Sequence, residues 1–140
     1  MTSALIGMGS NIKPEENLIR AAHALRRAFV EVQFSPVYQS KAIGMQGADF
    51  LNACCLIQSE MDCKELEQWC KQHENLCHRD ATLGSWRPRT IDLDILMFDE
   101  QVVDDELYRF AHAYIPATSL VDIKFAAIDE ALLSQVPLIL

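Results

Sequence analysis

The sequence lacks long hydrophobic runs. Among its 140 residues, no apolar segment approaches the roughly 20 residues that a membrane-spanning helix requires. The first residues, from Met1 to Gly7, contain neither a basic segment nor an extended apolar one, so they do not resemble a secretory signal. We therefore expect a cytoplasmic protein. The length suits a single domain over residues 1–140, which can bury a core without disulfides or a structural metal.

Basic residues are also scarce. Twelve Lys and Arg stand against 20 Asp and Glu, which gives a formal net charge of -8. General affinity for nucleic acid depends on neutralising phosphates with Lys and Arg, so the composition argues against a nucleic-acid-binding protein. Small anions remain possible ligands where basic residues cluster.

The five cysteines lack the paired C-x-x-C spacing that is typical of zinc sites. Cys63, Cys70 and Cys77 recur every seven residues, which places them on one stripe of a helix about 10 Å apart, too far to share one metal ion. We expect reduced thiols that pack as small apolar side chains.

Hydrophobic patterning predicts alternating strands and helices. A short apolar run from Ser3 to Met8 indicates a buried strand that ends in a glycine-containing turn. Apolar spacing predicts a helix from Pro14 to Val30, and a second helix that begins at Asp62 in a capping box with Glu65 and ends near Arg79. The remaining predictions are strands over 31–38, 50–59 and 91–98, with Pro36 marking an edge or a bulge, and a helix around 122–134.

These elements follow the order strand-helix-strand, strand-helix-strand. This is the split βαβ pattern of a ferredoxin-like α+β fold. We therefore expect an antiparallel sheet with helices packed on one face.

The strand predicted over 91–98 carries two acidic residues at alternating positions. Because successive side chains of a strand point to opposite faces, Asp92 and Asp94 share one face, with Cα atoms about 6.6 Å apart. Two carboxylates at this separation repel each other unless a cation or solvent compensates. Magnesium accepts one or two carboxylates when water and phosphate oxygens complete its ligands. The alternative is an ordinary solvated strand face.

A basic segment comes directly before this strand. It carries Arg79, Arg87 and Arg89, and Trp86 and Pro88 stiffen it. The planar donors of arginine suit phosphate oxygens. The alternative is a loop whose arginines lie in solvent. Together with the aspartate pair, the segment predicts a magnesium site for phosphate transfer.

The segment from Trp86 to Phe98, WRPRTIDLDILMF, resembles the signature of the 6-hydroxymethyl-7,8-dihydropterin pyrophosphokinase family of the folate pathway. Met8-Gly9-Ser10-Asn11 resembles the family's turn after its first strand, and Phe50-Leu51-Asn52-Ala53 resembles its aromatic-Leu-Asn-Ala pattern. The resemblance covers most of the chain and weakens after Phe98. It implies a ferredoxin-like fold in which ATP transfers its two terminal phosphates, as one group, to the hydroxymethyl oxygen of the pterin, releasing AMP.

The resemblance also implies roles for individual residues. Asp92 and Asp94 would bind two magnesium ions, and Arg79 and Arg89 would contact the reacting triphosphate. The resemblance further assigns Glu74, Ile95 and His112 to the ATP site, and Ser40, Ile43, Gly44, Phe50, Asn52 and Trp86 to the pterin site. Phe50 would stack on the pterin and Asn52 would bind its polar edge. The implied partners are therefore small molecules, without nucleic acid or membrane.

The chain departs from the family pattern at several positions. Ala81, Thr82 and Ser85 stand where the family's mobile loop is basic, and Ala111 replaces a proline before His112. Thr118 and Leu120 stand where the family has an arginine and a second stacking aromatic residue. Two alternatives therefore remain: a diverged non-catalytic paralogue that binds pterin or nucleotide as a regulator or partner, and transfer to a different hydroxyl-bearing heterocycle.

Overall fold

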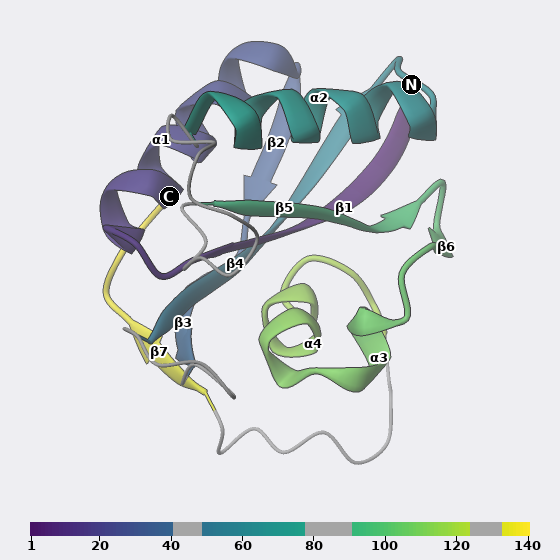
Figure 1. The fold of residues 1–140 in the computed structure, drawn as a ribbon. Helices are drawn as coiled ribbons and strands as arrows, with labels where there is room; N and C mark the ends of the chain where they lie inside the picture. The colour runs from purple at the N-terminus through teal and green to yellow at the C-terminus, as the bar shows by residue number, and fades with distance from the viewer. Residues whose placement is uncertain (41–48, 78–90, 124–132) are drawn as a thin grey trace.

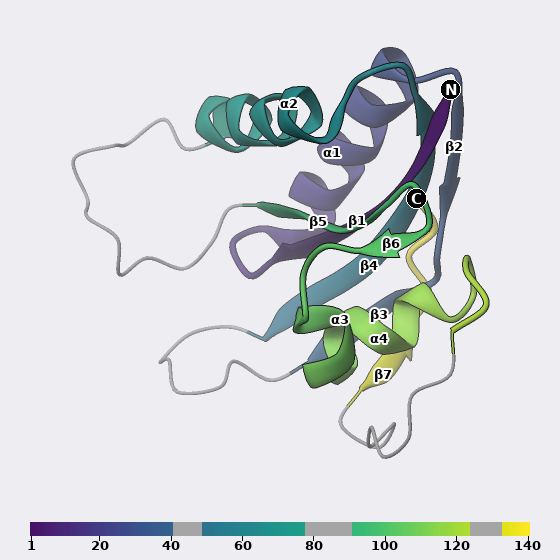
Figure 2. The same ribbon diagram turned by 90° about the vertical axis from the view of Figure 1, so that its right-hand side faces the viewer.

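The protein is built on one antiparallel sheet with helices on both faces (Figures 1 and 2). The computed structural model describes residues 1–40, 49–77, 91–123 and 133–140. The elements are, in order, β1 (Thr2–Ser10), α1 (Pro14–Ala28), β2 (Glu31–Phe34), β3 (Val37–Ser40), β4 (Phe50–Ser59), α2 (Cys63–Cys77), β5 (Asp92–Phe98), β6 (Gln101–Val102), α3 (Glu106–Arg109), α4 (Ala111–Ala117) and β7 (Ser134–Val136). The seven strands follow the order β6-β5-β1-β4-β3-β7, and β2 also pairs with β4. The predicted α+β ferredoxin-like class is confirmed.

The helices divide between the two faces of the sheet. α1 and α2 cover one face, whereas α3 and α4 lie on the other (Figures 1 and 2). The expectation that helices cover only one face was therefore wrong. α3 and α4 contain four and seven residues, and α4 includes Pro116, so neither is long enough to produce a clear helical repeat in the sequence.

The first strand shows how the two faces differ. Ala4, Ile6 and Met8 belong to the main core, which packs beneath α1 and α2. Leu5 belongs to a second cluster with Leu96 of β5 and apolar residues of α3 and α4. The following positions on that second face are Gly7 and Gly9, which leave space instead of filling it.

The two long helices begin as the sequence predicts. α1 has Pro14 at its start, and it ends at Ala28 because Phe29 adopts an extended conformation and is buried. Before α2, Asp62 Oδ1 accepts the Glu65 N–H at 2.8 Å and Glu65 Oε1 accepts the Asp62 N–H at 3.2 Å. The capping box is therefore present, and it satisfies two backbone donors at the start of the helix.

The predicted strand over 31–38 is interrupted. β2 and β3 both pair with β4, and Ser35-Pro36 separates them. Ser35 donates its N–H to the Cys54 carbonyl at 2.9 Å, and its hydroxyl oxygen accepts the Cys54 N–H at 2.8 Å. The hydroxyl thus replaces a backbone acceptor at the break. The irregularity predicted at Pro36 is confirmed, and it allows β3 to bring Ser40 opposite Phe50.

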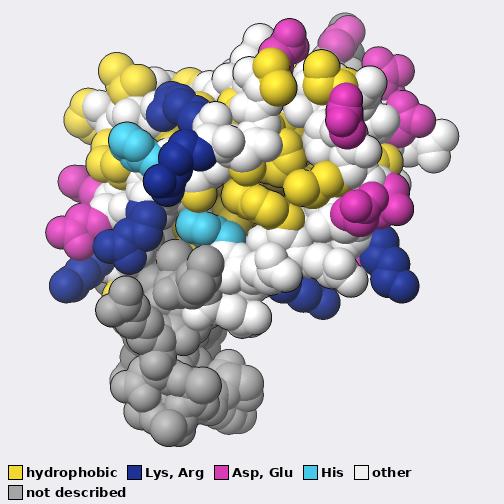
Figure 3. All heavy atoms as spheres, turned by 90° about the horizontal axis from the view of Figure 1, so that it is seen from above, with side chains coloured by type: hydrophobic (Ala, Val, Ile, Leu, Met, Phe, Trp, Pro, Cys, Tyr) yellow, Lys and Arg dark blue, Asp and Glu magenta, His cyan; other side chains and the backbone are white. Residues whose placement is uncertain are grey.

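The α2 helix buries the middle of the stripe on which Cys63 and Cys70 lie, whereas Cys63 itself is only partly buried. Leu66 and Cys70 are buried, and burial raises the pKa of the Cys70 thiol to about 12. Figure 3 looks onto the side of the molecule that α1 and α2 cover, and it shows hydrophobic side chains between the charged ones. Here Trp69 packs edge-to-face on Phe29, with centroids 5.2 Å apart, and stacks on His73 at 5.8 Å.

The C-terminal part differs from the prediction. The helix expected around 122–134 falls largely on residues outside the described part of the chain, and its expected end at Ser134 is instead the start of β7. β7 pairs with β3, and this pairing sets Val136 opposite Val37. Within the ranges that the structure describes, no helix is long and apolar enough to cross a membrane.

Candidate active site

A cavity of about 280 Å³ lies between the sheet and the layer formed by α3 and α4. Two rows of side chains cross the sheet at this point. Strand register places Gly9 between Asn52 of β4 and Asp92 of β5, and it places Gly7 between Cys54 and Asp94. The cavity is lined by Gly7, Met8, Gly9, Ser40, Phe50, Asn52, Asp92, Asp94, Leu96, Glu106, Phe110, His112 and Ala113.

The two glycines keep this cavity open. A Cβ atom at Gly9 would lie 3.4 Å from Asn52 Oδ1 and 4.0 Å from Phe50 Cδ1, and one at Gly7 would lie 3.1 Å from Leu96 Cδ1. Larger side chains on this stretch of β1 would therefore occupy the space between the amide of Asn52 and the aspartates. Glycine matters at these two positions because neighbouring side chains lie so close to the backbone of β1.

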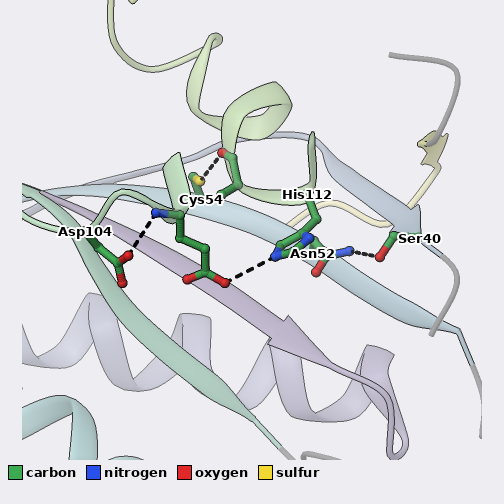
Figure 4. Close-up of polar contacts among 7 residues, drawn as sticks. Ser40, Asn52, Cys54, Asp104 and His112 are labelled. Carbon is green, nitrogen blue, oxygen red and sulfur yellow. Dashed lines mark hydrogen bonds and ion pairs between the residues drawn. The ribbon is translucent and has the colours of Figure 1, made fainter. Parts of the chain in front are cut away.

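One end of the cavity combines an aromatic ring with a fixed amide. Asn52 is 4% exposed, and its Nδ2 donates to Ser40 Oγ at 2.7 Å (Figure 4). This hydrogen bond orients the amide and leaves Oδ1 on the side of Gly9. The half-buried Phe50 lines the same end. An aromatic ring beside a fixed amide suits a flat heteroaromatic ligand, which gains from stacking and from hydrogen bonds at its edge.

The aspartates of β5 border the other side of the cavity. Asp92 is half-buried, and Asp94 is the more exposed of the two although part of its side chain is shielded from water. Partial burial, followed by the charges of Asp92, Glu106, Glu74 and Asp104, raises the pKa of Asp94 to about 7. The site therefore concentrates negative charge that a cation would neutralise.

The carboxylate pair fits magnesium by donor chemistry. Carboxylate oxygens are the hard ligands that this ion prefers, and it commonly takes its other ligands from water and substrate phosphates. Among the residues that the structure describes, no group of three or more His, Cys, Asp or Glu side chains is arranged to hold a metal ion. Any ion held by Asp92 and Asp94 would thus depend on ligands from outside these residues.

A second cavity of about 280 Å³ lies between β5 and α2, and Asp94 borders it as well. Glu74 and Ile95, both predicted at the ATP site, line this second cavity. Glu74 Oε1 accepts the backbone N–H of Leu93 at 2.8 Å. Among the described residues, β6 pairs with β5 at Met97 and Phe98, and this carboxylate binds the strand edge between the two aspartates. Glu74 therefore helps to hold β5 in place.

The layer of α3 and α4 contributes residues that the sequence did not single out. His112 Nε2 lies 3.4 Å from Glu106 Oε1, and this hydrogen bond lowers the pKa of Glu106. Phe110 stacks on His112, with centroids 5.2 Å apart and an interplanar angle of 14°. The sequence did not indicate Glu106 and Phe110 as site residues. The break between α3 and α4 separates both from His112, so the three residues do not recur at a helical spacing.

The structure brings six predicted residues to the first cavity: Ser40, Phe50, Asn52, Asp92, Asp94 and His112. Two further predicted residues, Glu74 and Ile95, lie at the second cavity. Thr118 is exposed, whereas Leu120 packs in the second hydrophobic cluster and lines neither cavity. The predicted site residues Ile43, Gly44, Arg79, Trp86 and Arg89 lie outside the described residues.

Comparison with known proteins identifies relatives. The family model described as 7,8-dihydro-6-hydroxymethylpterin-pyrophosphokinase matches residues 5–132. The chain is 35% identical over 107 residues to the 2-amino-4-hydroxy-6-hydroxymethyldihydropteridine pyrophosphokinase of Bacillus subtilis, a match covering 74% of this chain and 64% of the relative. The enzymes of that name from Aquifex aeolicus and Campylobacter jejuni are 30% and 35% identical, with matches covering 82% and 78% of this chain and 72% and 71% of theirs.

These matches extend well beyond the short signature around β5. The residues matched by the family model include those that line both cavities and those of the helices on both faces of the sheet. They confirm the resemblance that the sequence motifs indicate. The chain belongs to the 7,8-dihydro-6-hydroxymethylpterin-pyrophosphokinase family, whose members are transferases.

Proposed function

We propose that this protein transfers diphosphate from ATP to the hydroxymethyl group of 6-hydroxymethyl-7,8-dihydropterin in folate biosynthesis. Family membership supports the reaction class. The observation that carries the proposal is the position of Asp94, which borders both the cavity that suits a flat ring and the cavity beside α2. A carboxylate shared by two adjoining cavities lies where two substrates would meet.

In this proposal the pterin occupies the first cavity. Phe50 stacks on its ring and Asn52, held by Ser40, binds its polar edge. Ile43, Gly44 and Trp86 complete the pterin site on the family pattern. Since Gly9 separates Asn52 from Asp92 across the sheet, a ring bound at Asn52 extends toward the aspartates, which is where its hydroxymethyl group reacts.

ATP occupies the second cavity, where Glu74 and Ile95 line the nucleotide site. Its phosphates extend past Asp94 toward His112 in the first cavity. Arg79 and Arg89 contact the triphosphate on the family pattern and neutralise its charge. With two anionic groups already on β5, such cationic partners are needed to accept a polyphosphate.

Asp92 and Asp94 would hold two magnesium ions, which supply charge neutralisation for the phosphates when bound. The hydroxymethyl oxygen forms a bond to the β-phosphorus, and the bond from this phosphorus to the oxygen of the α-phosphate breaks. AMP leaves, and the hydroxyl proton is released. The protein's contribution is to align the two substrates and to stabilise charge, as in other phosphate transfers.

The test is direct. The protein is incubated with magnesium, ATP and the hydroxymethyl dihydropterin, and AMP and pterin diphosphate are followed by mass spectrometry. We expect both products in equal amounts, and none when magnesium is replaced by a chelator. If both ligands bind by calorimetry but no AMP forms above background, the protein is a non-catalytic binding paralogue and the proposal is wrong.

A further inference from the structure

We propose that Glu106 is a positioning residue for His112, and that it turns the imidazole so that Nδ1 faces the triphosphate. This inference rests on the proposed function, because it assigns the phosphate contact to His112. It adds a residue of α3 for which neither the sequence motifs nor the family pattern supplied a role.

Glu106 adds a third carboxylate to the first cavity. Its carboxylate lines the same cavity as Asp92 and Asp94, and its charge contributes to the raised pKa of Asp94. A third carboxylate would repel a polyphosphate that enters this space. Its hydrogen bond with His112 changes this balance, because the carboxylate oxygen then accepts from the imidazole and is not an isolated negative charge in the cavity.

The geometry determines which ring nitrogen remains available. An ionised carboxylate only accepts hydrogen bonds, so Nε2 of His112 carries the hydrogen that points to Glu106. Nδ1 is then the remaining polar atom of the ring. It donates to a phosphate oxygen when the ring carries a second proton.

The surrounding contacts hold the pair in place. The Glu106 N–H donates to Asp104 Oδ1 at 2.9 Å, which fixes the start of α3 (Figure 4). Phe110 covers one side of the His112 ring. The side chains of His112 and Glu106 are 36% and 29% exposed, so a ligand in the cavity can still reach the ring. These contacts restrain the histidine at a place where Ala111 replaces the family's proline.

The test measures binding of α,β-methylene ATP, which cannot transfer diphosphate, by calorimetry with magnesium. We expect Glu106→Ala and His112→Ala each to weaken binding about tenfold or more, as for loss of a charge-assisted hydrogen bond. The double variant should bind no more weakly than His112→Ala alone. Glu106→Gln, which can still accept from Nε2, should recover part of the loss. Asp105→Asn changes an exposed carboxylate of the neighbouring position and is the matched control.

Two results of the binding measurement would overturn the inference. One is an equal loss from Glu106→Ala in the presence and absence of His112, and the other is tighter binding by Glu106→Ala, which would mean that the carboxylate only repels phosphate. Nitrogen NMR of the His112 ring in the free protein gives a second readout. A ring signal that does not change in Glu106→Ala also contradicts the inference. Neither measurement requires turnover, so a failure of the proposed reaction remains distinguishable.

Discussion

The two faces of the sheet use the same strands for different purposes. On the face beneath α1 and α2, β1 contributes Ala4, Ile6 and Met8 to a closely packed apolar core. On the opposite face the same strand contributes Gly7 and Gly9, and space remains between Asn52 and the aspartates of β5. The candidate active site is therefore created by leaving side chains out of one face of the sheet.

This division also separates stability from ligand binding. Burial of apolar side chains on the packed face stabilises the fold. On the open face, partial burial and then the neighbouring carboxylates raise the pKa of Asp94, which costs stability until a cation or a ligand compensates. Changes on the two faces should therefore have different consequences, and the following variants test this.

The largest effect is expected from the aspartates. Asp92→Ala and Asp94→Ala should each lower turnover at least about 1,000-fold, because they remove the charges that hold magnesium at the reacting phosphates. Circular dichroism and thermal unfolding should show an intact fold. Asp105→Ala, which removes an exposed carboxylate directly before α3, serves as the control and should retain full turnover. Turnover within tenfold of the wild type in either aspartate variant would contradict the proposed metal site.

Leu25→Ala tests the packed face. Leu25 of α1 is fully buried in the main core, so its truncation should lower the free energy of unfolding by about 2–5 kcal/mol. Chemical denaturation measures this loss. At a temperature where the variant remains folded, its affinity for pterin should equal that of the wild type. A changed pterin affinity would show that the two faces are coupled.

Gly9→Val tests the open face. The added side chain would meet Asn52 and Phe50 and extend into the cavity. Pterin affinity, measured by calorimetry, should fall about tenfold or more because the ring loses space beside Asn52. The free energy of unfolding should change by less than about 1 kcal/mol, since the cavity has room for the side chain. A variant that is destabilised by several kcal/mol but keeps its affinity for pterin would contradict the comparison, since on this face we expect less than about 1 kcal/mol.

The smallest effect concerns pH. Because the folded protein raises the pKa of Asp94 to about 7 from an ordinary value of 3.8, this group binds more protons in the folded state between these values. Its contribution to stability therefore falls as pH rises from about 4 to about 7 and is constant above that range. Asp94→Asn should remove this dependence and raise the metal-free stability at pH 8 by roughly 1 kcal/mol, after allowance for solvent screening.

Thermal unfolding at several pH values compares the variant with the wild type. Magnesium should raise the wild-type melting temperature at pH 8 and leave Asp94→Asn nearly unchanged. An equal response to magnesium in both proteins would exclude Asp94 as a ligand.

The predicted single domain and the cytoplasmic location stay predictions.

Much of the fold followed from local patterns. The capping box at Asp62 and Glu65 and the strand pattern around Asp92 are short-range features, so the sequence alone could indicate them. α3 and α4 could not be predicted in this way, because each is shorter than the window of roughly 11 residues over which a helical pattern is recognised. For the same reason, only the family resemblance indicated a role for His112, and no local pattern indicated a role for Glu106.

The sequence by itself determined the family, the α+β class and the face of β5 on which Asp92 and Asp94 lie. Alternation along a strand is a local property of the backbone, so it requires no knowledge of neighbouring strands. Only the tertiary structure decided that Gly9 lies between Asn52 and Asp92, and that Glu106 meets His112. Both depend on strand register and packing between distant segments, which local patterns do not specify.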